Sequence, residues 1–136
     1  MATTIYYSND AERQFVDSTA LTVDTTLTPA DSGKTLYLDA VGEAITLPAV
    51  ADSAGVKYKF LVTAAVITTS WTVTADAAKI YGSVTEAGLV QLASAETAIT
   101  IVFTKAIQGD WFTLESDGTN WYVAGQFSVA ASFTTA

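Results

Sequence analysis

Apolar and polar residues alternate with a period of two along several stretches of the chain. The clearest is residues 56–62, Val-Lys-Tyr-Lys-Phe-Leu-Val, where the aliphatic and aromatic residues share one face and Lys57 and Lys59 share the other. The same pattern recurs at residues 34–39, 71–75 and 99–103. Alternation rich in β-branched and aromatic residues is typical of strands with one buried face. These stretches therefore predict half-buried strands.

Turn signals separate the predicted strands. Glycines preceded by Asp, Ser, Ala or Gln stand near residues 33, 55, 88, 109 and 118. The best-defined unit is residues 109–127, which predicts two strands joined through Asp117-Gly118, since Asp-Gly supplies the positive φ of a tight hairpin. Two registers are open, because Trp111 or Phe112 can face Trp121 or Val123, and a slip of one residue exchanges the faces.

Helix is scarce. Residues 28–32 predict a single turn, with Thr28 as N-cap and Pro29 in the first helical position, and residues 10–16 could add another. The sequence therefore predicts an all-β fold, an antiparallel β-sandwich or barrel with extended terminal arms. We expect an N-terminal arm over residues 1–20, the β domain over residues 21–126, and a C-terminal strand or arm over residues 127–136.

Composition narrows the function classes. The chain has no His and no Cys, which are the residues most used for proton transfer near neutral pH, thiolate chemistry and zinc binding. Its net charge of −8 disfavours nucleic acid and anionic membranes as partners. Only 15% of residues are charged although half are hydrophobic, so we expect other subunits to cover part of the surface. We predict no enzymatic activity, no cofactor and no metal.

Three motifs that could carry chemistry are weak. Residues 32–35, Ser-Gly-Lys-Thr, resemble the end of a phosphate-binding loop, but Thr28 stands where that loop needs its first Gly and a strand follows instead of a helix. Acidic residues are spread singly beside turn formers, so a hydrolase with paired carboxylates is disfavoured. No motif marks a serine for a Ser-Lys dyad. A calcium site across a subunit contact stays open.

Five turn-and-strand segments give the chain a resemblance to a known group of proteins. They are residues 27–35 (LTPADSGKT), 45–48 (ITLP), 55–60 (GVKYKF), 109–111 (GDW) and 116–123 (SDGTNWYV). Together they resemble a β-module of tailed-bacteriophage virion proteins, and are similar to capsid decoration (cement) proteins and to modules of tail fibres. The resemblance implies a small all-β protein, usually a homotrimer, standing on a capsid or in a fibre.

Two features favour the capsid. The chain is one short module without repeats or a shaft, and it has candidate arms at both ends. We therefore expect a homotrimeric structural protein on the outer surface of the virion capsid, which bridges adjacent major capsid proteins. The expected contact residues are Ile5, Tyr6 and Tyr7 in the first arm and Phe127, Val129 and Phe133 in the last.

The alternative is a receptor- or glycan-binding module of a phage tail or fibre. It requires an exposed aromatic residue, Trp111 or Trp121, beside the turn carboxylates Asp110 and Asp117. Sugar rings stack on such aromatic faces while carboxylates accept their hydroxyl hydrogen bonds. Whether both tryptophans are exposed depends on the register of the hairpin, which the sequence leaves open.

Overall fold

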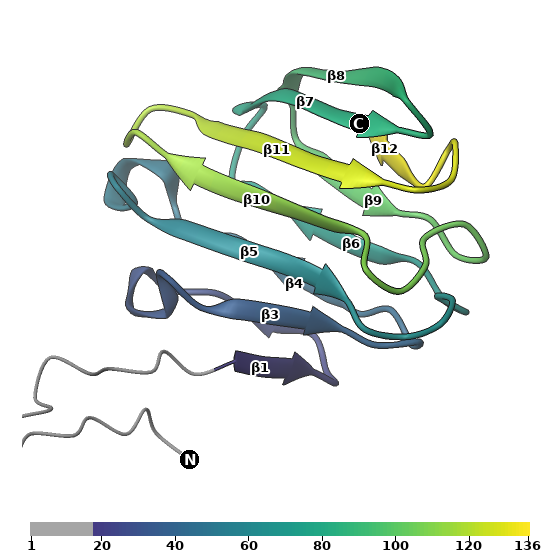
Figure 1. Ribbon diagram of the computed structural model, residues 1–136. Coiled ribbons are helices and arrows are strands. Elements are labelled where there is room, and N and C mark those ends of the chain that lie inside the picture. Colours follow the sequence, from purple (N-terminus) through teal and green to yellow (C-terminus); the bar gives the residue numbers. More distant parts are fainter. Residues whose placement is uncertain (1–17) are drawn as a thin grey trace, which may run out of the picture.

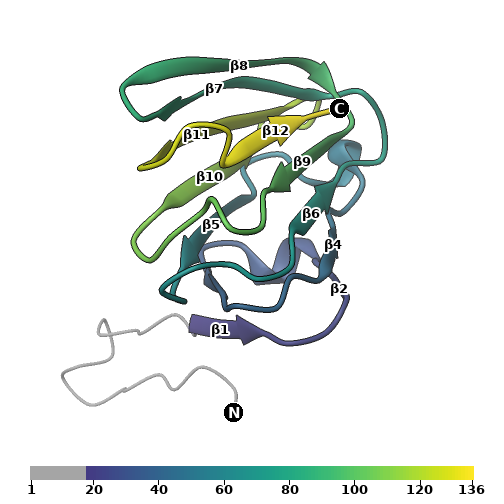
Figure 2. The ribbon, with the colours of Figure 1, turned by 90° about the vertical axis from the view of Figure 1, so that its right-hand side faces the viewer.

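The computed structural model describes residues 18–136, which form an all-β sandwich of two sheets (Figure 1). The seven-stranded sheet has the order β1 (Ser18–Leu21), β3 (Thr35–Leu38), β5 (Lys57–Val62), β10 (Trp111–Ser116), β11 (Trp121–Phe127), β7 (Ile80–Glu86) and β8 (Leu89–Glu96). The five-stranded sheet has the order β12 (Phe133–Thr135), β9 (Ala98–Ile101), β6 (Trp71–Thr74), β4 (Ala44–Thr46) and β2 (Thr25–Thr26). Figure 2 shows the two sheets facing each other. Two single turns of 3₁₀ helix, η1 (Pro29–Asp31) and η2 (Val50–Asp52), lie in loops.

Strand direction alternates strictly along the chain. The first six strands pass back and forth between the two sheets, so β1, β3 and β5 are parallel neighbours in one sheet and β2, β4 and β6 are parallel neighbours in the other. The later pairs β10–β11, β10–β5, β7–β8, β6–β9 and β12–β9 are antiparallel, while β7 and β11 are parallel. The predicted all-β sandwich is therefore confirmed, and its two sheets are mixed where purely antiparallel pairing was expected. All odd-numbered strands run toward the same end, on the right in Figure 1.

The inner faces of the sheets supply the core. Tyr58 and Phe60 of β5 are fully buried, as the alternation of residues 56–62 predicts. Phe60 stacks on Phe112 of β10, with ring centroids 4.5 Å apart and planes 10° from parallel. Aromatic pairs of this geometry contribute about 0.5–1.5 kcal/mol beyond the area they bury.

The hairpin register is now defined. Phe112 lies opposite Gly125, Leu114 opposite Val123 and Ser116 opposite Trp121. The even-numbered residues of β10 face the core and Trp111 faces outward, half-buried.

The single turn at residues 28–32 is also confirmed, since η1 begins after Thr28, whose backbone N–H donates to Asp31 Oδ2 at 2.9 Å.

The C-terminal segment is a strand of the domain's own sheet. β12 pairs with β9, with Phe133 opposite Ile101 and Thr135 opposite Ile99. A strand or an arm was expected for residues 127–136, and the structure shows a strand at Phe133–Thr135. The predicted N-terminal arm lies almost wholly outside the described residues, and the turn expected at residues 10–16 lies outside them.

Candidate functional site

Six odd-to-even connections lie at the end toward which the odd-numbered strands run, and we call four of these loops the tip. They are residues 22–24, 39–43, 63–70 and 102–110, which follow β1, β3, β5 and β9. Because direction alternates at every strand, each odd-to-even connection reaches this end, although the loops are far apart in sequence. The opposite end carries η1, η2 and the turn at residues 117–120 (Figure 1).

Hydrogen bonds tie the tip loops to one another. The Ala44 N–H donates to Asp24 Oδ1 at 2.8 Å, which links the first loop to the start of β4. The Thr68 N–H and hydroxyl both donate to the Ala40 carbonyl, at 2.7 and 2.8 Å. The Phe103 N–H donates to Ser70 Oγ at 2.9 Å. A loop whose polar backbone groups are bonded to neighbouring loops is held in place, so the tip is a fixed surface.

The fixed loops expose large apolar side chains. Val23 is 64% exposed, Val41 55%, Phe103 51% and Val66 40%. In the described part of the chain, only four other large hydrophobic residues are exposed, three of them on β8 and the fourth Tyr122. The tip therefore gathers half of the exposed large hydrophobics, and such gathering marks an interaction surface more than isolated residues do.

Acidic groups flank the apolar residues of the tip. The Asp39 carboxylate accepts a hydrogen bond from the Val41 N–H at 3.0 Å and holds the turn after β3. Loss of hydration, and then the nearby carboxyl groups of Asp24 and Asp39, raise the pKa of Glu43. A surface with apolar residues beside several carboxyl groups fits a partner that is apolar and neutral or basic.

The predicted carboxylate Asp110 serves the tip as a structural group. Its side chain is buried and accepts hydrogen bonds from the Ile107 N–H at 3.0 Å and from the Ser128 N–H and hydroxyl, both at 2.9 Å. Asp110 therefore fastens the 102–110 loop to the chain after β11, and its carboxylate is occupied by these donors.

The glycan-binding set predicted from the sequence is not brought together, and this prediction is corrected. Trp121 is fully buried against Tyr58, with ring centroids 5.9 Å apart, because the register points it into the core. Trp111 lies on the outer face, where Lys59 Nζ stands 5.5 Å from its ring centroid. Asp117 lies in the opposite-end turn, and its Oδ1 accepts from the backbone N–H groups of Thr119 and Asn120.

Those contacts perturb the ionisation of Asp117. The backbone hydrogen bonds from Asn120 and Thr119, and a further bond from the Tyr122 hydroxyl at 3.0 Å, lower the pKa of Asp117. The carboxylate therefore acts as the acceptor that closes its own turn. The exposed aromatic residue beside Asp117 is Tyr122, which was not among the residues predicted to bind a glycan.

The arm residues have different outcomes. Phe127 and Phe133 are only 2% exposed and pack against each other with ring centroids 5.6 Å apart. They belong to the core because β11 and β12 are strands of the domain's own sheets, so their prediction as contacts to another chain is corrected. Val129 is half-buried in the loop between these strands. Ile5, Tyr6 and Tyr7 lie outside the described residues.

The outer face of the seven-stranded sheet carries two shallow hollows on either side of Thr113. One, of about 370 Å³, is lined by Gly33, Lys34, Thr35, Lys57, Lys59, Trp111 and Thr113. The other, of about 430 Å³, is lined by Thr113, Glu115, Ser116, Asp117, Tyr122, Val123 and Ala124. The alternation at residues 56–62 correctly places Lys57 and Lys59 on this outer face.

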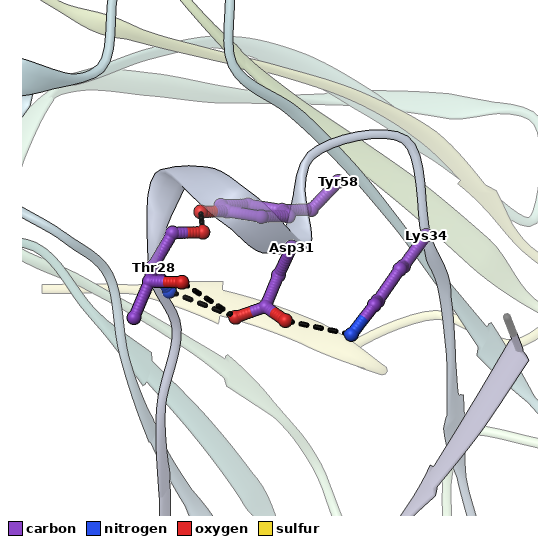
Figure 3. A network of polar contacts seen from close by, with 4 residues as sticks. All are labelled: Thr28, Asp31, Lys34 and Tyr58. Atoms are coloured by element: carbon purple, nitrogen blue, oxygen red, sulfur yellow. Dashed lines mark hydrogen bonds and ion pairs between the residues drawn. The ribbon is translucent and has the colours of Figure 1, made fainter. Parts of the chain in front are cut away.

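A polar network beside the first hollow fixes Lys34 (Figure 3). Lys34 Nζ donates to Asp31 Oδ1 at 2.7 Å, and Asp31 Oδ2 accepts from the Thr28 N–H and hydroxyl. Burial alone would raise the pKa of Asp31, but the hydrogen bonds from Lys34 and Thr28 outweigh it, and the pKa is lowered. The hydroxyl of Tyr58 donates to the Thr28 carbonyl at 2.6 Å. This network stabilises the loop before β3, and its charges are already paired.

Comparison with family models, curated proteins and solved structures finds no match for this chain. Within residues 18–136, the structure shows no cluster of three or more acidic, His or Cys side chains suited to a metal ion. Over the same residues, no helix has the length and apolar character needed to span a membrane. The tip, with its hydrogen-bonded loops and exposed apolar side chains, is the candidate functional site.

Proposed function

We propose that this protein is a structural component of a tailed-bacteriophage virion, which decorates the outer surface of the capsid and stabilises it by bridging adjacent major capsid proteins. The observation that carries the proposal is the tip, where hydrogen-bonded loops hold Val23, Val41, Val66 and Phe103 in solvent. An isolated soluble domain gains nothing from such a surface, whereas a protein that works in an assembly buries it.

The tip fits the mechanical task of a decoration protein. Its loops already hold one arrangement, so docking costs little of the conformational entropy that flexible loops would lose. Burial of its exposed valines and Phe103 supplies a non-directional gain, while Asp24, Asp39 and Glu43 favour basic or neutral groups on the shell. Many copies on one shell then add weak individual contacts into a stable coat.

The proposal is tested by binding of purified variants to shells assembled from the major capsid protein of the same phage. The tip variant Val41→Asp/Phe103→Asp places charge in the contact. Its matched control is Ala51→Asp/Ala78→Asp, which adds the same charge at exposed positions of the opposite end. Both variants should keep the wild-type free energy of unfolding, because all four positions are exposed.

Cosedimentation with shells measures the outcome. We expect the tip variant to lose at least about 1.4 kcal/mol of binding free energy, a tenfold loss in affinity per site, while the control binds as wild type does. Equal binding by the two variants would show that the tip is not the contact. If wild-type protein does not bind the shells at all, the decoration function itself is wrong.

The predicted contacts of Ile5, Tyr6 and Tyr7 are tested separately. A chain lacking residues 1–8 is compared with wild type in the same sedimentation assay. Weaker attachment with an unchanged free energy of unfolding is expected if the N-terminal arm adds to the contact made by the tip, and unchanged attachment would remove these three residues from the interface.

A further inference from the structure

The strand β8 forms one free edge of the seven-stranded sheet (Figures 1 and 2). Within residues 18–136 it pairs only with β7, so its other side presents backbone N–H and C=O groups along the edge. It also exposes three large side chains, Leu89 and Leu92 at 71% and Val90 at 65%. An apolar edge strand of this kind is a template for pairing with another strand.

Only one half of this edge is protected. The register with β7 shifts between Ile80 and Tyr81, Ala95 takes a φ of 61°, and the Ser94 N–H is covered by Glu96 Oε1 at 3.4 Å. Bulges and charged side chains are the features that block edge pairing. Residues 89–93 have no such protection, and no charged residue lies between Leu89 and Ala95.

We propose that β8 pairs antiparallel with β8 of a second copy of this chain, in a two-fold dimer centred on Gln91. In this register Val90 of one copy lies opposite Leu92 of the other, and Leu89 lies opposite Ala93. The pairing of β8 with β7 puts Val90 and Leu92 on the outer sheet face, opposite Thr85 and Ser83. The four apolar side chains of the two copies therefore meet on one face and shield one another from water.

The apolar segment from Leu89 to Ala93 is complementary to itself when two copies run antiparallel, and this makes a second copy the occupant. Two chains that each carry a net charge of −8 repel at most surfaces. The segment from Leu89 to Ala95 is uncharged, so two copies can approach there at the least electrostatic cost. In a two-fold contact, the residue on the axis meets its own copy. Gln91 suits the axis because its side-chain amide both donates and accepts hydrogen bonds.

The contact is predicted to be weak and concentration-dependent. A stable interface buries about 800 Å² on each partner, and one short strand with three exposed side chains supplies only part of this area. This dimer goes beyond the proposed function, because β8 is separate from the tip loops and its pairing can be measured without shells. It also differs from the homotrimer that the phage resemblance implies.

Sedimentation velocity of the purified full chain, over a wide range of concentrations, tests the proposal. We expect a monomer–dimer equilibrium in the wild type, and at least about a tenfold higher dissociation constant in Val90→Lys/Leu92→Lys. The matched control is Ala51→Lys/Ala78→Lys, which places the same charges on exposed residues at the end opposite the tip and should dimerise as wild type. Circular dichroism and urea unfolding check that each variant is folded.

The register is tested by a disulfide. The chain has no cysteine, so Gln91→Cys introduces a unique thiol that meets itself across the two-fold axis. We expect Gln91→Cys to form a covalent dimer under mild oxidation, in contrast to Thr119→Cys at the opposite end. A monomer at every concentration, self-association unaffected by Val90→Lys/Leu92→Lys, or a trimer without the Gln91→Cys disulfide would each overturn the proposal. Each leaves the shell-binding result of the tip variant unchanged, so the two proposals fail separately.

Discussion

The buried carboxyl group of Glu86 predicts a large loss of stability when it is removed. Glu86 is 1% exposed at the end of β7, and its Oε2 accepts hydrogen bonds from the Ser132 N–H at 2.6 Å and the Phe133 N–H at 3.1 Å. Both donors stand at the start of β12, so this one oxygen fastens the C-terminal strand to the β7–β8 hairpin. The other oxygen, Oε1, is buried and has no hydrogen-bond partner among the described residues.

The magnitude follows from these contacts. Hydrogen bonds to a carboxylate contribute about 1.5–3 kcal/mol each, and Glu86→Ala removes two and leaves both N–H donors without an acceptor. Removal also relieves the cost of burying the unpaired oxygen, about 1–3 kcal/mol. We therefore expect Glu86→Ala to lower the free energy of unfolding by about 2–4 kcal/mol, a large share of the 5–15 kcal/mol typical of a domain.

Urea unfolding measures this loss, with Glu115→Ala as the matched control. Glu115 stands on the outer face and makes an exposed ion pair with Lys57 at 3.9 Å, which contributes about 0–1 kcal/mol. Amide hydrogen exchange should show loss of protection at Ser132 and Phe133 in the Glu86 variant. A free energy of unfolding within 1 kcal/mol of the control, with both amides still protected, would refute the account of Glu86 as the fastener of β12.

Two further predictions concern stability. Burial, and then the charge of Asp31, raise the pKa of Tyr58 from 10.0 to about 12, so the folded state holds this proton more tightly than the unfolded chain. The resulting stabilisation of the folded state, up to about 3 kcal/mol, is complete below pH 10 and is lost as the pH rises to about 12. Urea unfolding midpoints measured over this pH window should therefore fall less steeply in Tyr58→Phe, which cannot ionise, than in wild type. Gly82 has a φ of +124°, and a Cβ there would lie 2.2 Å from the Val123 carbonyl oxygen, so Gly82→Ala should destabilise the fold by at least about 2 kcal/mol in urea unfolding. Gly88 has a φ of +84° and open space around it, so Gly88→Ala should cost only the strain of a positive φ and no steric clash. Equal losses of unfolding free energy in the two variants would contradict the clash predicted at Gly82.

Alternation along the sequence predicted the faces of strands but not their neighbours. Residues 56–62 show the same period whether β5 pairs with parallel or antiparallel strands, because direction changes the hydrogen-bond pattern and not the side-chain period. The parallel pairing of β3 with β5 arises because the chain crosses to the other sheet and back between them. That crossing depends on tertiary packing, which no local pattern encodes.

The pattern of apolar and polar residues does not predict β8, for a physical reason. Leu89, Val90 and Leu92 do not alternate with polar residues, since β8 is an edge strand and exposes residues from both of its faces. Trp111 and Trp121 do lie in alternating stretches, but the sequence does not show which of them faces the core. That depends on the register of the hairpin. The register places Ser116 opposite Trp121, and this pairing alone decides that Trp121 is buried and Trp111 is not.

The tip could not be found from the sequence, because its residues stand singly in separate loops. Val23, Val41, Val66 and Phe103 each look like an ordinary surface residue, and single exposed hydrophobics are common. They gather because strand direction alternates at every step, which sends each odd-to-even loop to the same end. The functional signal therefore lies in the topology.

The proposed contacts of the tip and of β8 are geometrically compatible with bridging. Every even-numbered strand, β8 included, runs away from the tip. An antiparallel β8–β8 contact therefore directs the tips of the two copies to opposite ends of one continuous sheet. Such a dimer lying along a shell would hold one tip against each of two capsomers, and the second contact, once the first has formed, would be favoured by its high effective concentration. A dimer with both tips on one side would grip a single capsomer more firmly but would join nothing, so the direction of β8 relative to the tip is the feature that makes a two-fold contact useful to a cement protein.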